Sequence, residues 1–120
     1  MHELTIAAEI FDYVLEFVNN AKISKVISIS LEIGALVAVD EESLKFSFET
    51  ISQRSSLHGA ELVININKIR SKCRVCGKVF IVKNWTNRCP SCKGIDNEII
   101  AGNNIYIKNL EIDYNGYFNT

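Results

Sequence analysis

Proline, histidine and an excess of charge of either sign are scarce in this chain of 120 residues, and its charge balance and composition exclude some classes of protein. There is one proline and there are two histidines, and thirteen lysines and arginines nearly balance fourteen aspartates and glutamates, for a formal net charge of -1. This balance argues against a protein that binds nucleic acid with its whole surface, because such proteins are usually strongly basic. With 48% hydrophobic and 22% charged residues, the composition is that of a folded globular protein, not of a disordered or collagen-like one.

Long hydrophobic runs are also missing, and so is the basic leader of a signal peptide. The apolar stretch at residues 6–18 is interrupted by three acidic residues and is too short to span a bilayer. We therefore expect a cytoplasmic protein with no membrane partner. In a reducing cytosol, closely spaced cysteines bind metal more often than they form disulfides.

The four cysteines fall within one short window and form a paired motif. They are Cys73, Cys76, Cys89 and Cys92, with two residues inside each pair and twelve between the pairs. Two intervening residues let a tight turn aim both sulfurs at one ion, and four thiolates in a tetrahedron select Zn²⁺, or iron in a rubredoxin-like site. A closed shell of four ligands indicates a structural site, so we predict a zinc ribbon that depends on metal to fold.

Other features of the cysteine segment leave alternatives open. Two disulfides or redox thiols would also use four cysteines, although the paired spacing disfavours both. Gly77 and Gly94 follow the two pairs and are expected to take the positive φ that such turns need. Trp85 is interpreted as an aromatic of the ribbon core, with a partner contact as the alternative. The segment 71–100 holds six basic and two acidic residues. A zinc-ribbon module that binds nucleic acid or protein therefore remains the alternative function.

Hydrophobic periodicity predicts two helices and three strands outside this segment. Apolar residues at steps of three and four predict a helix from Leu4 to Val18, with Leu4 on its buried face. A second helix would be capped by Asp40 and end near Arg54. Period-two alternation predicts three strands, at residues 26–33, 62–67 and 105–112.

These elements predict an α+β fold with a small mixed three-stranded sheet, two helices and an inserted zinc-ribbon module. Residues 1–70 and 101–120 would form the α/β domain, and residues 71–100 the ribbon. The first two strands should be parallel, because a strand–helix–strand connection is right-handed. We expect the last strand to pair antiparallel with the second, since the cysteine segment returns the chain near its exit point.

The first three residues offer a different set of metal ligands. The α-amine of Met1, the imidazole and amide of His2 and the amide of Glu3 make an all-nitrogen square plane, which suits Ni²⁺ or Cu²⁺ and not Zn²⁺. Asp40 could approach this terminus, but a helix cap explains it more simply. The second histidine, His58, is expected to be an exposed loop residue.

With these motifs in place, the sequence resembles the HypA/HybF family of nickel metallochaperones. The resemblance extends over essentially the whole chain in the correct order. It rests on Met1-His2-Glu3 opening an amphipathic helix, on EIGAL at 32–36, on FSFE at 46–49, on the paired cysteine motif and on IKNLEI at 107–112.

The resemblance implies a two-domain accessory protein of nickel–iron hydrogenase maturation, which in some organisms also serves urease. It maps Ni²⁺, as transported cargo, to Met1, His2 and Glu3, and structural Zn²⁺ to the four cysteines. It implies the hydrogenase large-subunit precursor, the maturation GTPase HypB and, in some organisms, urease accessory proteins as partners, with no nucleic acid. An enzyme is not expected, because the chain has neither a Ser-His-Asp set nor a phosphate-binding glycine loop.

Overall fold

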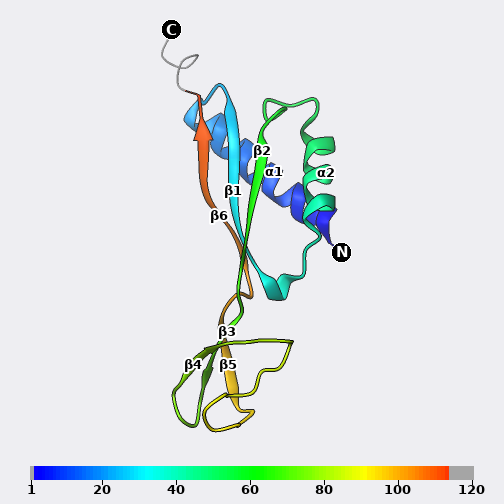
Figure 1. Cartoon of the computed structure of the whole chain (residues 1–120). Helices are drawn as coiled ribbons and strands as arrows, with labels where there is room; N and C mark the ends of the chain where they lie inside the picture. The colour runs from blue at the N-terminus through cyan, green and yellow to red at the C-terminus, as the bar shows by residue number, and fades with distance from the viewer. Residues whose placement is uncertain (1, 114–120) are drawn as a thin grey trace. The chain divides into compact units, whose positions relative to one another are not determined.

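The computed structural model describes residues 2–113 (Figure 1). Within that range, no helix has the length and hydrophobicity needed to cross a membrane. Two helices, a three-stranded mixed sheet and a separate cysteine-bearing sheet confirm the predicted α+β fold. The elements in chain order are α1 (Glu3–Ala21), β1 (Val26–Gly34), the 3-10 turn η1 (Ala35–Val37), α2 (Glu41–Ser52), β2 (Glu61–Asn67), β3 (Arg70–Cys73), β4 (Val79–Ile81), β5 (Asn97–Ala101) and β6 (Ile105–Ile112).

The chain divides into two compact units, each of which is made of segments that are not contiguous in the sequence. One unit comprises Met1–Leu31, Val39–Ile64 and Ile107–Thr120, and the other comprises Glu32–Ala38 and Asn65–Tyr106. The first unit therefore holds both helices, and the second holds the four cysteines.

Helix α1 buries one stripe of apolar side chains, as its periodicity predicts. The stripe follows steps of three and four along one face, through Ala7, Ile10, Val14 and Val18. The placement of Leu4 on this face is wrong, because its side chain is 63% exposed. Glu3, four residues before Ala7, is the buried residue at this end of the stripe. Leu4 is the next residue and is therefore rotated by about 100° around the helix axis, off the buried face.

Helix α2 begins with the cap that the sequence predicts. The Asp40 side chain accepts a hydrogen bond from the backbone N–H of Ser43 at 3.1 Å. This bond satisfies one of the donors that a helix start leaves unpaired. Inside the core, Phe48 meets Phe11 of α1 edge to face, with ring centroids 6.4 Å apart. The aromatic pair joins the two helices.

Strand β1 is the centre of the three-stranded sheet, whose order is β2-β1-β6. The expected pairing of the last strand with the second is therefore wrong. Gly34 donates its N–H to the Asn104 carbonyl at 2.8 Å, and Asp113 donates to Lys25 at 3.1 Å, so β6 runs antiparallel to β1. Figure 1 shows β1 and β2 running in the same direction, as the crossover rule predicts.

The burial of β1 explains this strand order. Ile29, Leu31 and Ile33 are buried, and so is Glu32 on the opposite face. A strand buried on both faces needs a hydrogen-bonding neighbour at each edge to satisfy its backbone groups. The returning strand therefore completes the free edge of β1 and does not extend the sheet beyond β2.

The cysteine-bearing unit contains a second sheet of order β4-β3-β5, in which both pairs are antiparallel. Phe80 packs with Cys73 and Cys89 in its small core. The expectation that Trp85 fills this core is wrong, because Trp85 is 71% exposed. Trp85 lies in a turn at φ 60, directly before Thr86, whose backbone bridges to Lys83, and a residue at such a tip has little to pack against.

Two glycines allow chain segments to approach one another very closely within the cysteine-bearing unit. A Cβ at Gly34 would lie 2.1 Å from the carbonyl carbon of Gly102. A Cβ at Gly102 would lie 2.5 Å from the Lys68 oxygen. Hydrogen bonds from Gly34 to Asn104 and from Leu36 to Gly102 hold the segments together. Only glycine fits at these two positions.

We predict that Gly34→Ala lowers the free energy of unfolding by about 3 kcal/mol or more, because the new methyl group overlaps backbone atoms that cannot move away independently. Guanidinium unfolding of the metal-loaded protein measures the change. Gly59→Ala is the control, since nothing lies within 4 Å of its Cβ position and only its φ of 87 is unfavourable. That control should cost about 1–2 kcal/mol. Equal losses for the two variants would contradict the close approach.

Candidate metal centres

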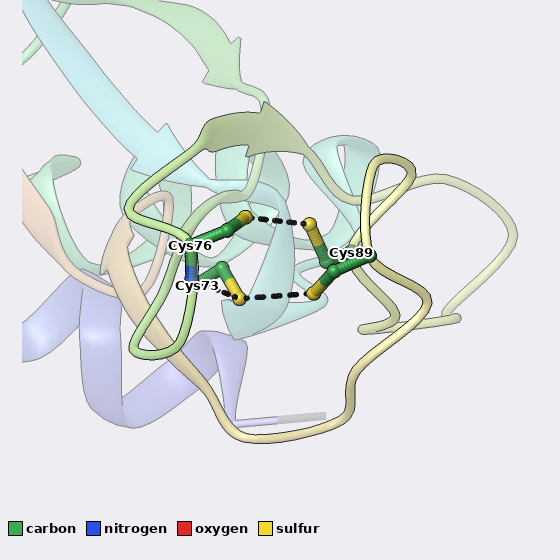
Figure 2. Close-up of side chains that lie close together, drawn as sticks. Cys73, Cys76 and Cys89 are labelled. Carbon is green, nitrogen blue, oxygen red and sulfur yellow. Dashed lines mark hydrogen bonds between the residues drawn. The ribbon is translucent and has the colours of Figure 1, made fainter.

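The four cysteine sulfurs lie close enough together to share one metal ion. Figure 2 shows the side chains of Cys73, Cys76 and Cys89 pointing toward one another from two loops. The Cys73–Cys92 and Cys76–Cys89 sulfur pairs are each 3.6 Å apart, and all four sulfurs lie within 4.8 Å of one another. Zinc–sulfur bonds of about 2.3 Å give a tetrahedron with edges of about 3.8 Å. The set therefore fits Zn²⁺, and all four cysteines are free, which argues against two disulfides.

The two cysteine turns have the same backbone geometry. In each turn the first cysteine donates its N–H to the carbonyl five residues on and accepts from the N–H four residues on. The bonds are Cys73 to Lys78 at 2.9 Å, Gly77 to Cys73 at 2.9 Å, Cys89 to Gly94 at 3.0 Å and Lys93 to Cys89 at 2.9 Å. The site is thus two copies of one turn facing each other, which is how paired spacing produces a tetrahedron.

The left-handed residue of each turn is the fourth after its first cysteine. Gly77 holds this place with φ 80, as expected. The same expectation for Gly94 is wrong, because Lys93 occupies the equivalent place with φ 64. Gly94 serves a different need: a Cβ there would lie 3.2 Å from the Cys92 sulfur. The prediction therefore placed the positive φ of the second turn one residue too late, at the glycine that follows the cysteine pair.

The thiols strongly influence one another's ionisation. The backbone N–H of Cys92 lowers the pKa of Cys89 to about 6. The pKa of Cys73 is also lowered, chiefly by the Cys76 N–H, which donates to its sulfur at 3.4 Å. For Cys92, the Gly94 N–H lowers the pKa, but the Cys73 sulfur and burial raise it to about 11. The pKa values of Cys73 and Cys89 are thus lowered and those of Cys76 and Cys92 raised, and a divalent metal would favour the ionised form of all four thiols.

The N-terminal ligands predicted from the sequence lie at the start of α1. His2 precedes the first helical residue and is exposed, and its carbonyl accepts from Ile6 at 2.9 Å. Glu3 is only 8% exposed. Met1 lies outside the described residues. Two of the three predicted nickel ligands are thus adjacent at the first turn of the helix.

The Glu3 carboxylate is held in place at this end of the helix. A hydrogen bond from the amino terminus and one from the Asp40 N–H lower the pKa of Glu3 to about 2. The Asp40 N–H lies 2.9 Å from Glu3 Oε2. Glu3 is therefore ionised at all physiological pH values, and its stabilising contacts are lost only as the pH falls from its ordinary value of 4.5 toward 2.

Asp40 makes two hydrogen bonds, and the sequence predicted only one of them. Its side chain caps α2, as predicted, and its backbone N–H binds Glu3. The second contact joins residues 37 positions apart, and no spacing rule connects them. Among the remaining sequence expectations, His58 is exposed in the turn before β2, as predicted.

Comparisons with known proteins identify the family of this chain. The family described as "Hydrogenase/urease nickel incorporation, metallochaperone, hypA" matches residues 1–112. The hydrogenase maturation factor HypA of Caldanaerobacter subterraneus subsp. tengcongensis is 35% identical over 117 residues, covering 94% of this chain and 100% of that protein. The HypA of Dehalococcoides mccartyi is 36% identical over 113 residues, covering 94% of this chain and 95% of its own.

Solved structures show the same fold. The solution structure of the nickel metallochaperone HypA from Helicobacter pylori superimposes with a TM-score of 0.69 at 24% identity, covering 93% of this chain and 97% of that one. A second HypA solution structure gives a TM-score of 0.72 over 94% and 97% of the two chains. The chain therefore belongs to the HypA family of hydrogenase and urease nickel-incorporation metallochaperones, which are maturation factors and not enzymes.

Proposed function

We propose that this protein binds Ni²⁺ at its N-terminal segment in the cytoplasm and delivers it for the maturation of nickel–iron hydrogenase, and of urease where that enzyme is present. The observation that carries the proposal is the hydrogen bond from the Asp40 N–H to Glu3. It fixes the first turn of α1 and leaves His2 exposed beside it. A potential ligand is thus presented to solvent on an ordered support.

The proposed nickel ligands are the amine of Met1, the imidazole and amide of His2, and the amide of Glu3. The first N–H groups of a helix have no partner inside it, so deprotonating these two amides breaks no helical hydrogen bond. The resulting nitrogen square plane suits Ni²⁺. An exposed chelate can be approached by a partner's ligands, and the cargo can then be released one bond at a time.

The four cysteines, in our proposal, hold a structural Zn²⁺ that is not exchanged. Their closed shell leaves no open position for an incoming ligand. Residues 71–100 would act as the zinc ribbon, and residues 1–70 and 101–120 as the nickel domain. The zinc fixes the shape of the ribbon, whose small core of Phe80 and two cysteines is too limited to fold alone.

The proposed partners are the hydrogenase large-subunit precursor, which would receive nickel, and the maturation GTPase HypB. Urease accessory proteins are the corresponding partners where urease is matured. The family description, hydrogenase and urease nickel incorporation, supports this assignment.

Zinc removal is expected to disorder the ribbon and leave the helices intact. We predict that a strong chelator abolishes the dispersed amide NMR signals of β3, β4 and β5, because metal binding supplies most of the folding free energy there. The helical circular dichroism should change little. Cys76→Ser should reproduce the loss, while Ser91→Ala, a change between the ligands of the second turn, should not. Persisting ribbon signals without metal would contradict a structural zinc.

A calorimetric nickel titration tests the N-terminal site directly. The zinc-loaded protein with a free, untagged terminus should bind one Ni²⁺. His2→Ala and a variant with extra N-terminal residues should each weaken binding by more than about 100-fold, because each removes a ligand of the chelate. His58→Ala replaces the other exposed histidine and should bind normally. If every variant binds alike, nickel is held elsewhere.

Nickel affinity is expected to fall on acidification from about pH 7.5 to about pH 5, because imidazole and amide ligation both require proton loss. The Glu3 carboxylate is not the cause of this fall, since even its ordinary pKa of 4.5 lies below the range and the hydrogen bonds it accepts, from the amino terminus and from the Asp40 N–H, lower the pKa further. Glu3→Gln should therefore keep the same pH dependence. The measurement is a competition titration against a metal indicator, and a pH-independent affinity of the native protein would exclude His2 as a ligand.

A further inference from the structure

A groove of about 430 Å³ lies between α2 and the start of β2, entirely within the helical unit. Phe48 and Leu62 form its floor, but both side chains are buried in the core. Phe46 also lines the groove and is 69% exposed, so an aromatic ring is available there to a binding partner. The exposed ring of Phe46 is therefore the apolar surface that the groove offers, and aromatic rings are common anchors in protein interfaces.

Charge around the groove is predominantly negative. Glu42, Glu49 and Glu61 line it and are exposed, and Lys45 is the one basic residue beside them. None of the three carboxylates forms a salt bridge with any residue in the described part of the chain. Three acidic groups against one basic group leave two uncompensated negative charges. An acidic segment would be repelled here, and a basic one attracted.

We propose that this groove binds a segment of a partner protein that places an apolar side chain between lysines or arginines. The apolar side chain would pack against the exposed ring of Phe46, and the flanking cations would meet Glu49 and Glu61 at the rim. Burial of the anchor supplies most of the affinity, and the rim charges supply selectivity and a faster encounter.

The groove lies along the helix whose start is bonded to the proposed nickel segment. Glu42 lies in the first turn of α2, two residues after Asp40, whose N–H binds Glu3. A segment seated along α2 therefore lies on the helix whose start contacts the proposed nickel segment. In this respect the inference rests on the proposed function, although the binding chemistry of the groove does not require nickel.

The test is an amide NMR titration of the full zinc-loaded protein in nickel-free buffer. The probe is a short blocked peptide in which leucines are flanked by arginines. Shifts should concentrate in residues 42–52 and 59–62. The double variant Glu49→Lys/Glu61→Lys should bind about tenfold more weakly, since attraction becomes repulsion at two positions. Phe46→Ala should also weaken binding, and the same peptide with glutamates in place of arginines should not bind.

The matched control is Glu9→Lys/Glu16→Lys, which makes the same change in net charge on the exposed side of α1 and should bind the peptide as the native protein does. Equal weakening by both double variants would overturn the proposal, as would shifts outside the groove or no binding at millimolar peptide. Concentration-dependent shifts of the same residues without peptide would instead identify a second copy of the chain as the occupant. Nickel titration of Glu49→Lys/Glu61→Lys separates the hypotheses, because nickel binding should be unchanged even if docking is lost.

Discussion

The close approach of Gly34 and Gly102 is the constraint on which much of this architecture depends. The chain leaves the first sheet after β2, forms the cysteine-bearing sheet and must return beside β1 to complete it. It does so by passing Gly102 against Gly34, where a single Cβ would overlap the backbone, and two hydrogen bonds then lead into β6. Because the returning segment meets β1 at this point, β6 completes the free edge of β1, and β1 becomes the central, buried strand.

The two metal centres are built on opposite physical principles. The cysteine site is closed: two turns with the same backbone hydrogen bonds bring four sulfurs close enough to share one metal ion. Such a site stabilises the fold around it and exchanges its ion reluctantly. The proposed N-terminal site would be open, because an exposed histidine stands beside a fixed carboxylate at a helix start. A metallochaperone needs both properties, a scaffold that persists and a cargo site that a partner can reach.

Helix α2 connects these requirements to recognition. Its first residues are held near Glu3 through Asp40, its buried face packs Phe48 against Phe11 of α1, and its exposed face lines an acidic groove with a free aromatic ring. A single helix thus supports the proposed cargo segment on one side and offers a docking surface along its length. Binding at that surface would place a partner on the helix whose start is bonded to Glu3.

The sequence by itself determined the features that depend on neighbouring residues. Cysteine spacing predicted the four-sulfur cluster, alternation predicted β6 to the residue, and Asp40 before two glutamates predicted a capped helix, because turns, pleats and caps are local chemistry. Tertiary structure alone decided the order β2-β1-β6, the exposure of Leu4 and Trp85 and the bond between Asp40 and Glu3. Each of these depends on which distant segment lies alongside, or on none lying there, and no local pattern records that.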